Sequence, residues 1–209
     1  MRKANSDFKT AFISEAGAGV VNNDYFAFVG LDEYACYVIA DGLYELEDAE
    51  GAKLAIETVI EKFHEHPSMQ KHVLHGYLAA ANKRLIQAEK KRISMKASLT
   101  VVVTNYEKMR YACAGNTRMY LYRSGEAMVH STDMTLAQAE LETEDASPDL
   151  LSMHRERNNL YCYLGQPSGF APYVSESFKL KESDIIPPIT RGICEYIDAG
   201  VFHDVLWET

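Results

Sequence analysis

The sequence has 209 residues, of which 47% are hydrophobic and 24% are charged, and its formal net charge is −9. This length and composition are typical of one globular domain, so residues 1–209 are predicted to fold as a single domain that needs no disulfide or structural metal. The acidic balance argues against non-specific nucleic-acid binding and against binding to an acidic membrane surface, because both depend on clustered lysine and arginine.

Cysteine usage and hydropathy point to a cytoplasmic protein. The four cysteines are far apart and form no C-x-x-C pair, so we expect buried thiols in a reducing compartment. The N-terminus lacks the apolar core of a signal peptide, and no apolar run approaches the roughly 18 residues of a membrane span.

The first part of the chain has strand patterns. A short strand is predicted at 9–13, and two aromatic and β-branched runs at 25–31 and 34–40 predict a β-hairpin. The second run is almost wholly apolar, which predicts a central strand buried on both faces. It ends at Asp41-Gly42.

Two long helices and a series of shorter elements follow. The apolar spacing predicts helices over 48–64 and over about 68–92, separated by Pro67, with Ser68 or a neighbour as the second cap. Further strands are predicted at 97–104, 109–114, 119–123, 127–130, 160–163, 174–180 and 184–190, and further helices at 136–141, 148–155 and 192–206. Without strict βαβ alternation, this order predicts an α+β layered domain.

Two aspartates lie at neighbouring ends of the predicted hairpin. Asp24 begins the first strand and Asp41 ends the second, so antiparallel pairing would place their carboxylates side by side. Such carboxylates repel each other unless a cation lies between them, and hard oxygen ligands suit Mg²⁺ or Mn²⁺. Gly42 would let the ion approach the backbone closely. The same spacing is also compatible with a turn cap at Asp24 and an ordinary turn at Asp41-Gly42.

Two other polar segments leave their roles open. Arg118 could bind phosphate or could lie exposed on a strand. The segment 154–159 contains His154, Arg155 and Arg157, which could bind an anion or form the polar end of a helix.

Seven segments in this order resemble motifs of the metal-dependent, type 2C (PPM) serine/threonine protein phosphatases. Asn22 to Phe26 resembles the motif N-[EQ]-D-x-[FY], and Ala40-Asp41-Gly42 matches A-D-G. The other five resemblances lie at residues 48–52, 97–102, 112–121, 132–135 and 157–165.

The resemblance implies a two-sheet antiparallel β-sandwich flanked by helix pairs, in α-β-β-α layers. It also implies a binuclear Mg²⁺ or Mn²⁺ centre at one end between the sheets, where a metal-bridging water attacks the phosphorus of a phosphoprotein. By position, Asp24, Asp41 and the Gly42 carbonyl match the first metal ligands.

Several positions depart from the family pattern. Asn23 replaces the acidic residue of the first motif, and Asn116 replaces the aspartate of the G-D-S-R turn. Arg191 lies in the segment 189–192, where the family has an S-D-G turn that supplies a late metal ligand. The loop 43–45 replaces the family's M-G-G. The early phosphate-binding arginine, the final D-N motif and its strand have no counterpart, so the domain is expected to lack the family's last strand and helix.

These departures predict one metal site at most and weak or lost phosphomonoester hydrolysis, with a regulatory or binding role toward a phosphoprotein or a regulatory protein. The alternative is an active, divergent phosphatase, in which Arg191 points away from the metals or contacts phosphate directly. An unrelated α+β domain with structural acidic turns is a third possibility. A missing last strand would leave a sheet edge open, which would favour self-association.

Overall fold

The computed structural model describes residues 8–17, 21–43, 50–89, 95–144 and 154–194. The strands in these ranges are β1 (Asp24–Gly30), β2 (Ala35–Gly42), β3 (Ala97–Thr104), β4 (Lys108–Ala114), β5 (Arg118–Arg123), β6 (Glu126–His130), β7 (Tyr173–Val174), β8 (Phe178–Lys179) and β9 (Pro188–Ile189). The helices are α1 (Glu50–Glu65), α2 (Lys71–Ala88), α3 (Leu136–Glu144) and α4 (Arg191–Cys194).

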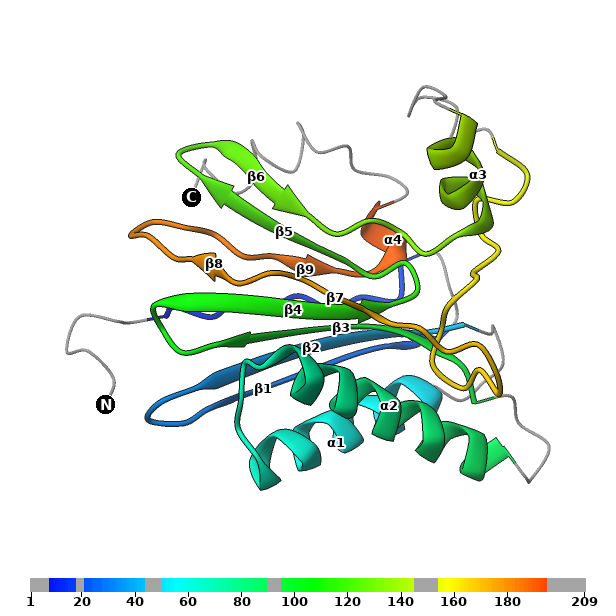
Figure 1. Ribbon diagram of the computed structural model, residues 1–209, viewed down its shortest axis with the longest axis horizontal. Helices are drawn as coiled ribbons and strands as arrows, with labels where there is room; N and C mark the ends of the chain where they lie inside the picture. Colours follow the sequence, from blue (N-terminus) through cyan, green and yellow to red (C-terminus); the bar gives the residue numbers. More distant parts are fainter. Residues whose placement is uncertain (1–7, 18–20, 44–49, 90–94, 145–153, 195–209) are drawn as a thin grey trace.

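The strands form two antiparallel sheets that pack face to face. The larger sheet has the order β1-β2-β3-β4-β7, with β8 also paired to β4, and the smaller sheet has the order β6-β5-β9. Helices α1 and α2 cover the outer face of the larger sheet, while α3 lies at one end of the smaller sheet (Figure 1). The predicted α+β sandwich with flanking helices is therefore confirmed.

The hairpin of β1 and β2 forms as the sequence patterns predict. Strand β2 lies between β1 and β3, and its register pairs Asp24 with Asp41 on one side and Asp41 with Ser98 on the other. The helix-facing side of β2 is fully buried, but Tyr37 and Ile39 on its other side are only half-buried. The prediction of a strand buried on both faces applies better to β3, which is buried at every position.

Helices α1 and α2 form an antiparallel pair through their apolar stripes. Phe63 of α1 and Tyr77 of α2 make an edge-on ring contact at 6.4 Å. The cap of α2 is Gln70, whose side chain makes no capping bond. Ser68, predicted as a possible cap, instead accepts a hydrogen bond from the backbone N–H of Gln70 at 3.1 Å, because its hydroxyl lies in the turn before the helix rather than at the helix start.

Two hydrophobic clusters occupy the two sides of the larger sheet. One lies between this sheet and the α1–α2 pair, and the other lies between the two sheets. Cys36, Cys113 and Cys162 are buried in these layers as free thiols, and Cys194 is half-buried. Burial raises the pKa of the Cys113 thiol to about 12, which keeps it in the neutral form at physiological pH.

The predicted strand at 9–13 is wrong, because the described segment 8–16 has no regular secondary structure. Its side chains are largely exposed, and it forms no backbone ladder with either sheet among the described residues. Phe12 is 68% exposed and contacts the ring of Phe26 at 4.2 Å between centroids. Side-chain contacts such as this one hold the segment against the sheet without making it a strand, since strand assignment depends on ladder hydrogen bonds.

Three later strand predictions are wrong or too long. Residues 160–163 make only an isolated bridge, from Leu160 to Thr135. The run 174–180 splits into β7 and β8, because Ser175 interrupts the ladder between them and its hydroxyl accepts the backbone N–H of Tyr111 at 3.0 Å. The run 184–190 shortens to β9, as expected for a segment whose two prolines cannot donate to a ladder.

The remaining helix predictions fall partly outside the described residues. Of the helix predicted at 148–155, residues 148–153 lie outside, and a turn occupies 155–158. Of the helix predicted at 192–206, α4 accounts for the start and residues 195–206 lie outside. In the described part of the chain, no helix has the length and apolar character needed to cross a membrane.

Candidate metal site

Asp24 and Asp41 lie directly opposite each other at one end of the larger sheet. Ser98 of β3 continues this row beyond Asp41. Residues paired in an antiparallel ladder project to the same face, and two positions further along β3 the hydroxyl of Thr100 bonds to Thr117, which precedes β5 of the other sheet. The carboxylates therefore lie on the face that looks toward the smaller sheet.

A close backbone contact fixes the end of the hairpin. The N–H of Gly42 donates to the carbonyl oxygen of Asn23 at 3.1 Å. A Cβ added to Gly42 would lie 3.3 Å from the Asn23 carbonyl oxygen and 3.3 Å from its Cβ, which is tighter than ordinary contact. Glycine at this position therefore lets the two strand ends approach, and it holds Asn23 beside the carboxylate pair.

The turn that holds Asn116 packs against β3 next to Asp41. The hydroxyl of Ser98 donates to the Asn116 side-chain oxygen at 2.9 Å and accepts the Asn116 backbone N–H at 3.2 Å. Gly115 has a φ of +103°, and a Cβ there would lie 2.1 Å from the Ser98 hydroxyl. The side-chain oxygen and the backbone N–H of Asn116 thus hold this turn to the sheet, and Asn116 brings a neutral amide where the family motif has a carboxylate.

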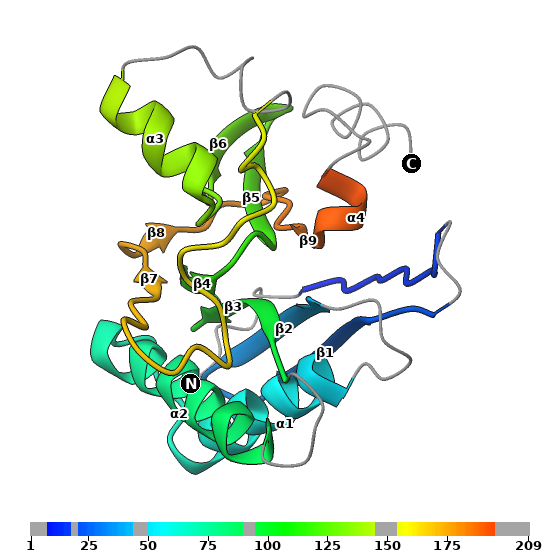
Figure 2. The same cartoon turned by 90° about the vertical axis from the view of Figure 1, so that its right-hand side faces the viewer.

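Thr190 and Arg191 follow β9 and meet Asp24 from the other sheet. The Thr190 hydroxyl donates to Asp24 Oδ2 at 2.6 Å, and Thr190 is only 3% exposed. Figure 2 looks onto this end of the sandwich and shows α4, which Arg191 begins, at the end of β9. Thr190 and Arg191 therefore lie beside Asp24.

Opposing effects act on the carboxyl group of Asp24. Burial raises its pKa above the usual value, while the Thr190 hydrogen bond and the positive charge of Arg191 act in the opposite direction. The net pKa is raised, so burial outweighs the two favourable neighbours. This carboxylate lacks the full compensation that a buried negative charge needs.

The side chains at this end suit one hard cation better than two. Asp24 and Asp41 supply carboxylate oxygens, and the Gly42 carbonyl and the Asn23 amide are further oxygen donors at the same open end of the hairpin. One Asp24 oxygen already accepts the Thr190 hydrogen bond. Among the residues that the structure describes, no group of three or more His, Cys, Asp or Glu side chains is arranged to hold a metal. A pair of divalent ions brings a charge of +4, which two carboxylates do not balance.

The other polar segments of the sequence have structural partners. Arg118 forms a two-pronged ion pair with Asp133, with both N–O distances at 2.7 Å, and the paired carboxylate raises the pKa of Arg118 above its usual range. The Nε2 atom of His154 lies 3.1 Å from Oε2 of Glu140 in α3. The carboxylates that Arg118 and His154 contact here are therefore Asp133 and Glu140, and not Asp24 or Asp41.

Sequence reasoning placed Asp24, Asp41, Gly42, Asn23 and Arg191 at one site, and the structure brings these segments together. It missed Thr190 as the hydrogen-bond partner of Asp24 and Ser98 as the partner of Asn116. The available signal for Thr190 was its place immediately before Arg191 in the turn that resembles the late ligand motif.

Comparisons with known proteins agree with this architecture. Sequence models of protein families give no match, and curated protein sequences give none. Among solved structures, the serine/threonine phosphatase Stp1 from Staphylococcus aureus superposes with a TM-score of 0.81 at 15% identity, over 93% of this chain and 80% of that chain. The serine/threonine phosphatase of S. agalactiae superposes with a TM-score of 0.76 at 14% identity, over 94% of this chain and 83% of that chain.

A third similar structure is PppA, described as a key regulatory component of T6SS in Pseudomonas aeruginosa. It superposes with a TM-score of 0.72 at 20% identity, over 94% of this chain and 83% of that chain. At these identities the likeness establishes the fold and leaves activity to the chemistry of the site. Two packed antiparallel sheets, the α1–α2 layer and these structural matches together show that the chain has the fold of the PPM-type serine/threonine phosphatases.

Proposed function

We propose that this protein is a type 2C-like phosphatase domain that binds phosphoprotein partners in a regulatory role, with weak or lost phosphomonoester hydrolysis. The proposal depends mainly on the contact between Thr190 and Asp24, with Arg191 adjacent. Thr190 brings a hydroxyl donor and Arg191 brings a cation to a position where a second metal ion would need another carboxylate.

One Mg²⁺ or Mn²⁺ ion is the proposed cofactor. Asp24, Asp41 and the carbonyl of Gly42 would hold it, with water molecules completing the coordination shell. When bound, such an ion neutralises the charge of a phosphoryl group and polarises its oxygens. The two carboxylates alone would repel a phosphate dianion, so phosphate binding at this end is expected to require the cation.

Arg191 is proposed as the second positive partner of the bound phosphoryl group. Its side chain is exposed at the start of α4, and a guanidinium can donate two parallel hydrogen bonds to phosphate oxygens. Together with one divalent ion, it would make the net charge of the site positive. Arg191 cannot hold a nucleophilic water as a metal ion does. We therefore expect the site to bind a phosphoryl group even though it hydrolyses phosphomonoesters weakly or not at all.

Binding and turnover of one phosphoserine peptide test this proposal. Fluorescence anisotropy with Mn²⁺ present should show saturable binding that is lost without Mn²⁺ and in Asp41→Ala. Arg191→Ala should weaken binding about 10- to 100-fold, as expected for loss of a charged hydrogen bond worth about 1.5–3 kcal/mol. The unphosphorylated peptide is the matched ligand control, and phosphate release should stay below one turnover per protein molecule.

Multiple turnovers that Asp41→Ala abolishes would contradict the proposal and favour the active, divergent phosphatase. In that case Arg191→Ala should lower kcat rather than peptide affinity alone. Absence of peptide binding under all metal conditions would contradict both functions.

A further inference from the structure

A pocket of about 240 Å³ opens at the opposite end of the larger sheet from the carboxylate pair. The residues that give it its chemical character are Lys108, Arg110, Ser68, Ser177, Asn105 and Gln70. They come from the start of β4, the turn before it, the turn before α2 and the segment between β7 and β8. The pocket thus lies where four chain segments meet on the helix-facing side of the sheet.

The lining of this pocket is cationic in an acidic protein. Lys108 and Arg110 line it, no carboxylate does, and the whole chain has a formal net charge of −9. Lys179 of β8 lies directly opposite Lys108 in the ladder and adds a third positive charge nearby. Positive charge beside hydroxyl and amide donors favours an anionic ligand.

The guanidinium of Arg110 is held in position with donor capacity left over. Its Nη1 donates to the carbonyl oxygen of Met69 at 2.6 Å. Its Nε is buried and has no hydrogen-bond partner among the described residues. A buried donor without an acceptor is costly, and an arginine whose orientation is fixed by one bond loses little further entropy when it binds a ligand.

The N-terminus of the long helix α2 adds to the positive field here. Gln70 caps the helix without a side-chain hydrogen bond, and the first turn contains no acidic residue. Lys71 in that turn forms an ion pair with Glu176. The hydrogen bond from Lys71, together with its charge, and to a lesser extent the charge of Arg110 lower the pKa of Glu176. Glu176 is therefore a nearby carboxylate that competes with an incoming anion for these cations.

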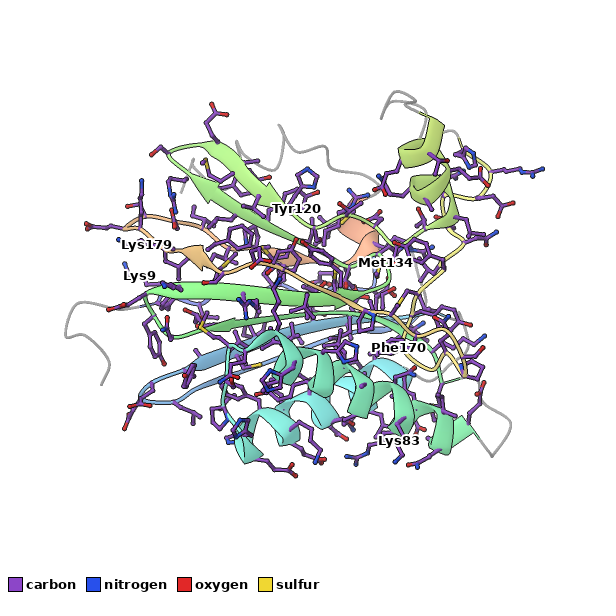
Figure 3. The ribbon with its side chains drawn as sticks, viewed as in Figure 1. Lys9, Lys83, Tyr120, Met134, Phe170 and Lys179 are labelled. Atoms are coloured by element: carbon purple, nitrogen blue, oxygen red, sulfur yellow. The ribbon has the colours of Figure 1, made fainter. Side chains whose placement is uncertain are left out.

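The pocket and the carboxylate pair lie too far apart to share one phosphoryl group. In Figure 3, Lys179 and Met134 mark opposite ends of the sandwich, and the Met134 N–H bonds to the carbonyl of Gly115, close to Asp41. From Ser98 to Thr104, β3 spans about 20 Å. The pocket also lies on the helix side of the sheet, whereas the carboxylates face the other sheet.

We propose that this pocket is a second, metal-independent binding site for a phosphate monoester, with Arg110 and Lys108 as the two groups that bind the phosphate oxygens. The hydroxyls of Ser68 and Ser177 complete the set of donors, and the volume suits a phosphate with a small substituent. The site is independent of the function proposed for the Asp24–Asp41 end. The ligand chemistry is shared by a free phosphorylated metabolite and by a phosphorylated side chain.

Calorimetric titration with inorganic phosphate, O-phosphoserine and a phosphoserine peptide, all in EDTA, tests this site. EDTA removes divalent ions, so the Asp24–Asp41 end contributes nothing. The wild type should bind in about the millimolar range or tighter. Preference for free O-phosphoserine over the peptide would identify a metabolite site, and the reverse preference would identify a protein ligand.

Four variants decide whether the binding occurs in this pocket. Lys108→Gln and Arg110→Gln should each weaken phosphate binding at least about tenfold, while Glu176→Gln should tighten it because a competing carboxylate is removed. Arg84→Gln is the matched control, since Arg84 lies in an exposed pair with Glu61 on the helix surface, and its phosphate affinity should equal that of the wild type.

Absence of wild-type binding up to about 10 mM phosphate would overturn the proposal. Binding that is unchanged in both Lys108→Gln and Glu176→Gln would also overturn it, because the ligand would then be elsewhere. Lys108 and Glu176 are exposed, so these two variants should fold even if loss of the Arg110–Met69 contact destabilises Arg110→Gln. A thermal melt of each variant confirms that the comparison is made between folded proteins.

Discussion

Arg191 sets the charge balance next to Asp24. Its guanidinium and the Thr190 hydroxyl both favour the ionised carboxylate, yet burial keeps the pKa of Asp24 raised. A divalent ion would supply the missing compensation, because it lies closer to the oxygens than an exposed side chain can. A second ion would meet a cation instead of a ligand at Arg191.

Replacement of this cation by a carboxylate should restore a second metal position. Arg191→Asp is expected to raise Mn²⁺ uptake above that of the wild type, because it adds a ligand and removes a repulsive charge. Titration calorimetry measures the stoichiometry, and Arg191→Asn is the matched control that removes the charge without adding a carboxylate. Equal uptake by the Asp and Asn variants would show that Arg191 does not exclude a metal.

Gly115 is a residue at which even a small substitution should be strongly destabilising. Its φ of +103° disfavours any side chain, and a Cβ would overlap the Ser98 hydroxyl at 2.1 Å. Gly115→Ala should therefore lower the free energy of unfolding by about 2–4 kcal/mol. Gly76→Ala is the control, since a Cβ in this exposed helical position meets nothing within 4 Å, and it should raise stability by about 0.5–1 kcal/mol. Urea denaturation measures both, and equal effects would contradict the argument.

The ion pair of Arg118 and Asp133 is a second stability determinant at the residue scale. Its two N–O contacts are both 2.7 Å, and its side chains are 32% and 18% exposed. Asp133→Asn should lower the free energy of unfolding by about 1–3 kcal/mol, because a charged hydrogen bond is lost in a partly buried place. Glu61→Gln breaks the exposed pair with Arg84. It should lower the free energy of unfolding by less than about 1 kcal/mol when both variants are compared by urea denaturation. A larger loss in Glu61→Gln would be inconsistent with this ranking.

At the scale of elements, Asn82 joins α2 to the loop that starts at Gly165. This loop follows Leu164, which forms an isolated β-bridge with Ala97. Its side-chain oxygen accepts the N–H groups of Gly165 and Gln166 at 2.7 and 2.9 Å, and its amide donates to the Gln166 carbonyl at 3.0 Å. Asn82 is 8% exposed, so water cannot readily replace these bonds.

Truncation of Asn82 should therefore loosen the docking of this loop on α2. Asn82→Ala is expected to lower the free energy of unfolding by about 2–3 kcal/mol, because buried backbone groups lose their partners. The neighbouring Lys83 is exposed, and Lys83→Ala should change stability by less than about 0.5 kcal/mol. Hydrogen exchange at Gly165 and Gln166 adds a local readout, and unchanged protection there in Asn82→Ala would refute the role assigned to Asn82.

Long elements were predictable because their patterns are set locally. The β1–β2 hairpin, β3 and the two long helices follow from alternation and from helical spacing over many residues, and tertiary contacts reinforce them. The pairing of Asp24 with Asp41 then follows from the hairpin itself. Short elements were less predictable, because a two-residue strand such as β7 exists only through its partner β4.

The side-chain contacts of the site depend on distant pairings that no local pattern reveals. Thr190 lies 166 positions along the chain from Asp24, and only the packing of β9 against the larger sheet brings its hydroxyl there. Ser98 and Asn116 are only 18 positions apart and meet at the open end of the β3–β4 hairpin, so their contact depends on the register of that hairpin. The resemblance drew attention to the segment of Arg191, but the hydrogen bond from Thr190 to Asp24 is visible only in the structure.

At the scale of the whole molecule, two proposed sites of opposite charge lie at the two ends of the sandwich. The Asp24–Asp41 pair is proposed to attract one divalent cation. The pocket lined by Lys108 and Arg110 is proposed to attract a phosphate monoester. About 20 Å of β3 separates them, so ligands at the two ends would communicate through the sheet rather than by contact.

Calorimetric titration of the wild-type protein with Mn²⁺, beside Asp41→Ala, tests the central claim most directly. We expect about one equivalent of Mn²⁺ per chain, because two carboxylates at the paired ends of β1 and β2 suit a single hard cation. We expect no saturable Mn²⁺ binding in Asp41→Ala. Two equivalents in the wild type would show an intact binuclear centre. Identical isotherms for the two proteins would show that the carboxylate pair holds no metal.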